Sequence, residues 1–217
     1  MKLKWKYAIG EILIVIIGIS IAFALNNWKE SNANERQKKQ YLENLVLDIN
    51  EEIKQLEANQ KNVQDRLKKI TIVLPFLGVK QGNRDSIARH IFNLAMPINF
   101  HPESTTYQTL VNSGDMKLIN NFQLRRSLEE HYAFHKQVTQ NYKRIEKIHE
   151  RYLGDFFIHE IDYKNMRNGD YAFLDKQLLS NIILSTQGSY YMILQGNTAC
   201  IESNKKLLAK VEEELEN

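Results

Sequence analysis

The first apolar segment of the chain runs from Tyr7 to Leu25 and reads YAIGEILIVIIGISIAFAL. Glu11 is its only charged residue, and the residues after the segment are polar enough to fold in water. A helix rises by about 1.5 Å per residue, so the segment comes close to the roughly 30 Å of a bilayer's hydrocarbon core. The pattern therefore predicts one transmembrane anchor, residues 1–28, in contact with the lipid bilayer.

A cleaved signal peptide is the alternative reading of this segment. A basic start, an apolar run and the tripeptide Ala22-Phe23-Ala24 follow one another, as they do in signal peptides. However, the run is long for a signal peptide, and Trp28 lies where a membrane helix would emerge among the lipid headgroups. Trp5 and Tyr7 mark the opposite interface in the same way. The sequence therefore favours a retained anchor.

The orientation of the anchor depends on the basic residues at its two ends. Those before it (Lys2, Lys4 and Lys6) nearly balance those after it (Lys29, Arg36, Lys38 and Lys39). Long domains are exported largely regardless of charge, whereas a short basic tail is easily retained. We therefore expect a single-pass protein of the bacterial inner membrane with its soluble domain in the periplasm.

Beyond a polar stalk or linker, residues 29–41, mostly apolar residues recur at every third or fourth position in three long series, with Gln60 filling the position between Leu56 and Val63. The first series is Leu42, Leu45, Ile49, Ile53, Leu56, Val63, Leu67, Ile70, Leu74 and Leu77; the second is Leu124, Leu128, His131, His135, Val138, Tyr142, Ile145, His149, Tyr152, Phe156 and His159; the third is Tyr190, Leu194, Asn197, Ile201, Asn204, Leu208, Val211 and Leu215. Each series predicts a long amphipathic helix.

Shorter helices are expected between the long ones. Asp85 or Ser86 can cap a helix that ends near Met96, and Ser104 or Thr105 can begin another that Gly114 closes. The second long helix begins near Asn121 and can be interrupted at Gly154, and residues 174–184 form a separate short helix before the third. The predicted fold is all-α: one N-terminal transmembrane helix, then an elongated antiparallel helical bundle over residues 42–217 with short capping helices.

Charge excludes one class of partner. The net charge is +3, and basic clusters such as Arg36–Lys39 and Lys143–Lys147 are interleaved with acids or amides. A nucleic-acid-binding domain would normally concentrate its basic residues on one face, so no nucleic acid is expected. The single cysteine, Cys200, lies in an apolar helical stretch and is expected to be a buried apolar side chain.

His131 and His135 are the candidate metal ligands. They are one helical turn apart, so both imidazoles can reach a single ion, with Glu129 and Glu130 nearby. His149 and His159 are too far along the helix to share that ion. The competing explanation is packing, in which the histidines lie in the core and bond to Asn197 and Asn204 of the third series.

No catalytic motif is present. The chain lacks Gly-x-Ser-x-Gly, a glycine-rich phosphate loop, Cys-x-x-Cys and the metalloprotease pattern His-Glu-x-x-His. The acidic pairs and runs Glu51-Glu52, Glu129-Glu130 and Glu212 to Glu214 are expected to be solvated helix faces. The sequence therefore predicts a protein that is not an enzyme and that has no cofactor.

Glu11 is the most unusual residue of the anchor, because a carboxylate inside a membrane is costly unless it is protonated, paired or shielded. It shares a helical face with Gly18 and Ala22, small residues that let two helices approach closely. This face predicts homo- or hetero-oligomerisation through the membrane. Alternatively, Glu11 extends to the interface beside Lys4 or Lys6.

Two blocks of residues resemble a family of uncharacterised single-pass membrane proteins from Bacteroidetes, a domain of unknown function. The blocks are Tyr7-Ala8-Ile9-Gly10-Glu11-Ile12 with Ile17-Gly18-Ile19, Ile21-Ala22, Asn26-Asn27-Trp28 and Glu30, and Tyr107-x-x-Leu110 with Ser113-Gly114 and Leu118-Ile119-Asn120. Ser20 departs from the aliphatic residue expected in such an anchor. The resemblance implies a helical single-pass protein and supplies no activity, cofactor or catalytic residue.

The function expected from these features is that of a non-enzymatic, membrane-anchored helical bundle that binds a partner or serves as an assembly subunit of a membrane complex. One alternative is a metal-binding protein that uses His131 and His135. The other is a ligand sensor, whose output would lie in a partner because only a short tail precedes the anchor.

Overall fold

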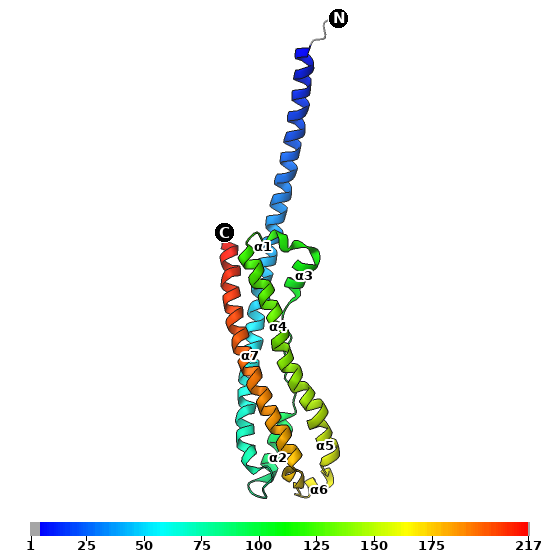
Figure 1. The fold of residues 1–217 in the computed structure, drawn as a ribbon, viewed down its shortest axis with the longest axis vertical. Helices are drawn as coiled ribbons and strands as arrows, with labels where there is room; N and C mark the ends of the chain where they lie inside the picture. Colours follow the sequence, from blue (N-terminus) through cyan, green and yellow to red (C-terminus); the bar gives the residue numbers. More distant parts are fainter. Residues whose placement is uncertain (1–4, 217) are drawn as a thin grey trace.

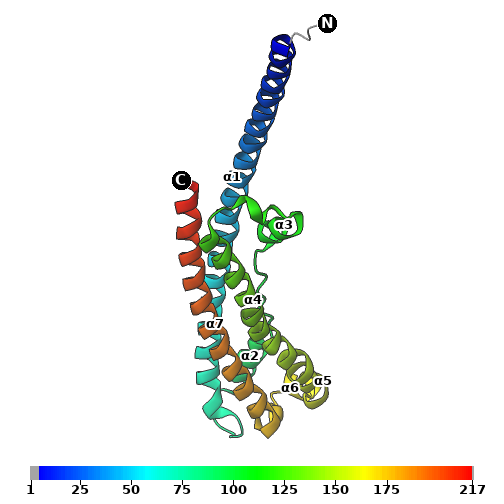
Figure 2. The ribbon, with the colours of Figure 1, turned by 45° about the horizontal axis from the view of Figure 1, so that its top comes forward.

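The computed structural model describes residues 5–216, which are helical apart from short loops and turns and include no strand. The predicted all-α class is therefore confirmed for this range. Lys2 and Lys4, used above to orient the anchor, lie outside it. Figures 1 and 2 show an elongated molecule in which one long helix extends well beyond the others.

That long helix is α1, Trp5–Val73, with 69 residues. Its first part contains the apolar segment and stands clear of the rest of the chain in both views (Figures 1 and 2). No residue of the most apolar window of 18 residues is buried, and its length and composition are sufficient to cross a membrane. The predicted stalk is a continuous part of the same helix.

Two further long helices pack beside the second part of α1. They are α4, Phe122–Ile148, and α7, Gln177–Glu216. α7 contacts both α1 and α4 along its length, and Figure 1 shows it running opposite to both. The three helices bury two groups of apolar side chains. One group lies near the start of α4 and includes Leu45, Leu128 and Leu207. The other lies nearer the end of α4 and includes Ile70, Ile145 and Tyr190.

Short helices connect the long ones. They are the 3₁₀ helix Leu74–Phe76, α2 (Arg84–Leu94), α3 (Thr105–Ser113), the 3₁₀ helix Asp115–Leu118, α5 (Asp155–Glu160), α6 (Tyr163–Arg167) and the 3₁₀ helix Ala172–Asp175. α2 and α3 both pack against α1.

The caps of these helices agree with the sequence in two places and differ in one. Gly114 ends α3 with a left-handed backbone, φ 74°, as predicted. Asn121 caps α4 by accepting a hydrogen bond from the backbone nitrogen of Leu124. However, α2 is capped by Asn83, which accepts from the nitrogen of Ser86, so the predicted caps Asp85 and Ser86 are wrong. Both lie inside the first turn of the helix.

The second apolar series was predicted wrongly at Tyr152 and His159, although its member Phe156 is buried as expected. Residues His149–Gly154 form a turn of π-helix, whose wider turn rotates all later residues relative to an α-helix. The buried residues are therefore Ile148, Leu153 and Phe156, while Tyr152 and His159 are exposed.

The third long helix begins earlier than predicted. α7 continues without a break through Gly188, so residues 174–184 are not a separate helix. Buried Leu179, Ile183 and Ser189 lie before Tyr190 on the same helix and extend its packed face. Packing of this face overrides the weak helical propensity of one glycine.

Candidate functional site

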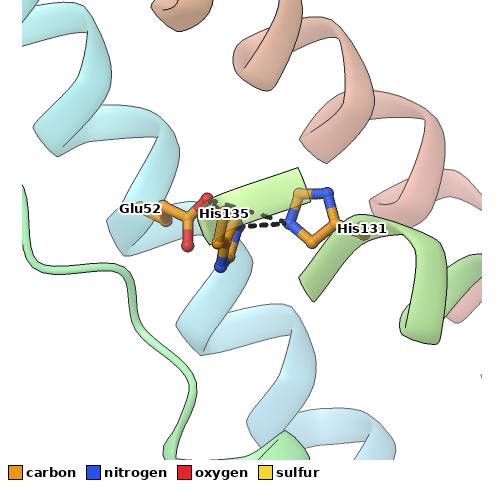
Figure 3. Close-up of side chains that lie close together, drawn as sticks. All are labelled: Glu52, His131 and His135. Carbon is orange, nitrogen blue, oxygen red and sulfur yellow. Dashed lines mark hydrogen bonds and ion pairs between the residues drawn. The ribbon is translucent and has the colours of Figure 1, made fainter. Parts of the chain in front are cut away.

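A cluster of three polar side chains lies in the core between α1 and α4. Glu52 comes from α1, and His131 and His135 come from successive turns of α4, so their side chains share one face of that helix. All three point toward one another (Figure 3). Their exposed fractions are only 1%, 3% and 4%, respectively, so the cluster is shielded from solvent.

The distances within the cluster are short. His135 Nε2 lies 2.8 Å from Glu52 Oε1 and 2.9 Å from His131 Nε2. His131 Nε2 lies 3.8 Å from the same carboxylate oxygen. Three atoms that can each offer a lone pair therefore converge on one small volume.

Helix α7 supplies the second layer of contacts. Asn204 Nδ2 donates a hydrogen bond to Glu52 Oε1 at 2.7 Å, and Ser203 Oγ lies 2.8 Å from His131 Nδ1. Cys200, one turn before Asn204, has its sulfur 3.7 Å from the same glutamate oxygen. Glu52 and His131 are thus held from the third helix as well as from their own.

Aromatic rings close the cluster on another side. Tyr132 contacts the rings of both histidines edge-on and stacks on Tyr107, with 4.1 Å between the ring centroids. Phe100 contacts the His135 ring edge-on. These rings are apolar surroundings in which a polar group without a partner would be costly.

Burial determines the charge of the groups around Glu52. It lowers the pKa of His131 to about 4, with a further contribution from His135, while Glu52 opposes the shift. His131 is therefore neutral at pH 7 and keeps a lone pair on one ring nitrogen. Burial, followed by the charge of Glu52, raises the pKa of the Cys200 thiol, which is therefore protonated.

A small cavity leads from the surface to this cluster. It has a volume of about 200 Å³ and is lined by Ser127, Glu130, His131, Ser203, Lys206, Leu207 and Lys210. His131 belongs both to the cavity lining and to the cluster, and Ser203, which contacts His131, also lines the cavity. This side of the cluster, at the Nδ1 edge of His131, is therefore bordered by a polar cavity.

The sequence predicted part of this cluster. His131 and His135 lie together as expected, and Asn204 contacts the cluster, but Asn197 instead donates to Tyr142 Oη at 2.8 Å. Glu129 and Glu130 lie on the exposed face of α4. His149 and His159 do not join the cluster.

The prediction that Glu52 is solvated was wrong. Its neighbour Glu51 is exposed, whereas Glu52 is buried. A signal was present in the first apolar series, where Ile49 to Ile53 is an irregular step. With Glu52 in place of Ile53, the steps from Ile49 to Leu56 become three and then four, as in the rest of the series.

A second candidate site is a groove between α4 and α7, toward the end of the molecule that lies away from the apolar segment. Its volume is about 940 Å³. Among its lining residues are four cations, Lys143, Arg144, Lys147 and Arg151, and the exposed apolar side chains of Tyr152, Leu178 and Met192. No acidic residue lines it. Glu146 lies between these cations in the sequence but does not line the groove.

The predicted anchor face lies on the exposed part of α1. Glu11, Gly18 and Ala22 are all exposed, and a Cβ atom built on Gly18 would meet no atom within 4 Å. The face is open to a second helix, and its role in assembly stays a prediction.

Comparison with protein-family models gives a match to a family of unknown function. A family model described as a family of unknown function, DUF6090, matches residues 11–204. The chain belongs to the DUF6090 family. The match spans most of the apolar segment, the Glu52–His131–His135 cluster and the basic groove. Neither the curated proteins nor the solved structures contain a match. Membership in a family of unknown function is thus confirmed, while the Bacteroidetes origin and single-pass topology of this DUF6090 member stay predictions.

Proposed function

We propose that this chain is a non-enzymatic, single-pass membrane protein whose helical domain binds a partner as an assembly subunit of a membrane complex. In this proposal residues 1–28 anchor the protein in the bacterial inner membrane. Residues 42–217 form an elongated antiparallel bundle with short capping helices in the periplasm. The groove between α4 and α7 is the surface that binds the partner.

The observation that carries the proposal is the continuity of α1. The helix is apolar and exposed in its first part, whereas Leu42, Leu45 and later residues of the same helix are buried in the domain core. An apolar helix of this length without a protein partner is stable in lipid rather than in water. Because no loop separates the two parts, the domain would be held directly on the membrane helix.

The composition of the groove suggests the chemistry of the partner. Lys143, Lys147 and Arg151 are exposed cations beside the exposed ring of Tyr152. Arg144 is held in place by a hydrogen bond from its Nε to Ser189 Oγ, at 3.2 Å. A concentration of one charge around apolar side chains favours a partner segment that is acidic and amphipathic. The proposed partner is therefore a protein with such a segment.

The test is photo-crosslinking in native membranes with the full chain. A photoreactive amino acid at Tyr152 should capture a discrete protein, whereas the same amino acid at exposed Ile72 on α1 should not. Lys147→Glu combined with Arg151→Glu should reduce the Tyr152 product at least tenfold. Lys61→Glu combined with Lys80→Glu makes the same charge change outside the groove and should leave the product unchanged.

Either of two results would contradict the groove as the binding surface. The first is equal crosslinking from Tyr152 and Ile72. The second is a Tyr152 product that persists in the Lys147→Glu, Arg151→Glu variant while that variant is still inserted and helical. A chain recovered from the soluble fraction after membrane separation would contradict the anchor.

A further inference from the structure

We propose that Glu52, His131 and His135 form a binding site for a divalent transition-metal ion of the zinc type. This inference goes beyond the proposed function, because neither the membrane anchor nor the groove requires a metal. It also extends the pair of histidines expected from the sequence to a complete set of three ligands, with an acid from a different helix.

The separations between the three candidate ligand atoms fit one metal ion. Zinc binds imidazole nitrogen and carboxylate oxygen at about 2.0–2.2 Å in a tetrahedron, which places neighbouring ligand atoms about 3.4 Å apart. The measured separations are 2.8, 2.9 and 3.8 Å. Shifts of a few tenths of an ångström at each side chain would therefore bring all three to bonding distance.

With Glu52 ionised, one shared hydrogen serves the three candidate ligand atoms poorly. The two Nε2 atoms are 2.9 Å apart, so at most one of them can carry a hydrogen without a clash. If Nε2 of His135 carries the hydrogen, that single hydrogen faces both the Glu52 carboxylate and the Nε2 lone pair of His131. If Nε2 of His131 carries the hydrogen, the Nε2 lone pair of His135 faces a lone pair of Glu52. A cation bound at the centre would accept all three lone pairs at once.

The contacts behind the ligands resemble those that hold metal-binding side chains. A metal-bound histidine usually donates its other ring N–H to an oxygen, and ligand carboxylates are themselves hydrogen-bonded. Ser203 Oγ lies 2.8 Å from His131 Nδ1, and Asn204 donates to Glu52 at 2.7 Å. Ser203 would thereby direct the Nε2 lone pair of His131 into the cluster.

Three protein ligands leave one position of a tetrahedral zinc ion for a fourth ligand. Two histidines and one glutamate are the protein ligands of several zinc sites that keep one open position. A cavity of about 200 Å³, lined in part by His131 and Ser203, lies beside the site. Cys200 is not in the group of ligand atoms that lie within 4.8 Å of one another, so water rather than the thiol would complete the coordination.

Metal binding can be measured directly on the full chain in detergent, purified with a tag that lacks histidine and then treated with a chelator. Titration with Zn²⁺ alone should give about one ion per chain, and Co²⁺ alone should give the visible absorption of a four-coordinate ion. Glu52→Gln and His135→Ala should each weaken Zn²⁺ binding at least tenfold. Ser203→Ala should weaken it about tenfold through loss of the supporting contact.

Matched controls separate this site from nonspecific binding. His159→Ala removes an exposed histidine from α5, and Glu51→Gln changes the neighbouring, exposed acid on α1; both should bind like the unaltered protein. Circular dichroism identifies variants that lose helicity, and the near-isosteric Glu52→Gln is the decisive variant if His135→Ala fails to fold. Substoichiometric Zn²⁺ in the folded, unaltered protein would overturn the proposal, as would full binding in folded Glu52→Gln.

Discussion

His135 on α4 and Glu52 on α1 lie 2.8 Å apart, Nε2 to Oε1, although a long stretch of chain separates them. The contact connects α4 to the helix that carries the apolar segment. Both side chains are almost fully buried, so the contact is made away from water. Loss of one partner would leave the other in a medium that solvates it poorly.

We predict that His135→Leu destabilises the metal-free protein by about 3 kcal/mol, the lower end of the cost of breaking a buried pair. Asn204 still donates to Glu52, which reduces the penalty. The double variant Glu52→Leu, His135→Leu should recover much of the loss, because no buried charge is then left without its partner. Denaturant unfolding of chelator-treated full chain in detergent measures both values.

Glu51→Gln is the control for this pair. Glu51 is exposed on the same helix, so its substitution should change stability by no more than about 0.5 kcal/mol. A His135→Leu cost as small as that of Glu51→Gln would show that the buried contact contributes little.

Acid should destabilise the protein through His149. Burial and the nearby charge of Arg66 lower its pKa to about 4 from 6.5, and its Nε2 is buried without a hydrogen-bond partner. The unfolded chain therefore binds a proton below pH 6.5 more readily than the folded chain does. Stability is fully present above pH 6.5 and falls as the pH drops toward 4, by up to about 1.4 kcal/mol per pH unit for each such group.

His149→Phe should reduce this pH dependence, because it removes the titrating group and keeps an aromatic ring beside Tyr190. His131 has a pKa shifted in the same direction, so part of the dependence should persist. Denaturation midpoints at pH 7 and pH 5 provide the comparison, with exposed His159→Phe as the control. A pH profile unchanged by His149→Phe would contradict the assignment.

The sequence predicted the long helices well because each has a regular apolar series. The prediction failed where a polar residue or a change of helix type interrupted this regular series. Glu52 occupies a core position, but an acid there is stable only with partners on α4 and α7, which no local pattern reveals. Likewise, the π-helical turn at His149–Gly154 changes which residues face the core. Its effect, the burial of Leu153, is seen in the folded structure but not in the sequence.

The basic groove was missed for a different reason. Its cations come from α4 and the π-helical turn that follows it, but its apolar residues Leu178 and Met192 come from α7. The predicted break between residues 174–184 and the last helix separated these two residues into different elements. Only a continuous α7 aligns them beside α4.

Two glycines within α7 should respond in opposite ways to alanine. A Cβ atom on Gly188 would meet nothing within 4 Å, so Gly188→Ala should stabilise the protein by about 1 kcal/mol through helix propensity. On Gly196 it would lie 2.9 Å from Asn141 Nδ2, which donates to the carbonyl of Met192. Gly196→Ala should therefore gain less or destabilise. Denaturant unfolding of the two variants side by side checks the order, and equal gains would contradict it.

The exposed face of α1 should determine whether the anchors associate. Gly18 has open space around it, and leucine there would keep a second helix from approaching the backbone. Gly18→Leu and Glu11→Leu should each shift detergent-solubilised protein toward monomer in sedimentation measurements. Ser20→Leu adds a similar bulk on the opposite side of the helix and should leave the assembly unchanged. If all three variants sediment with the same size as the unaltered protein, this face does not associate. Glu11 would then be accommodated at the membrane interface instead.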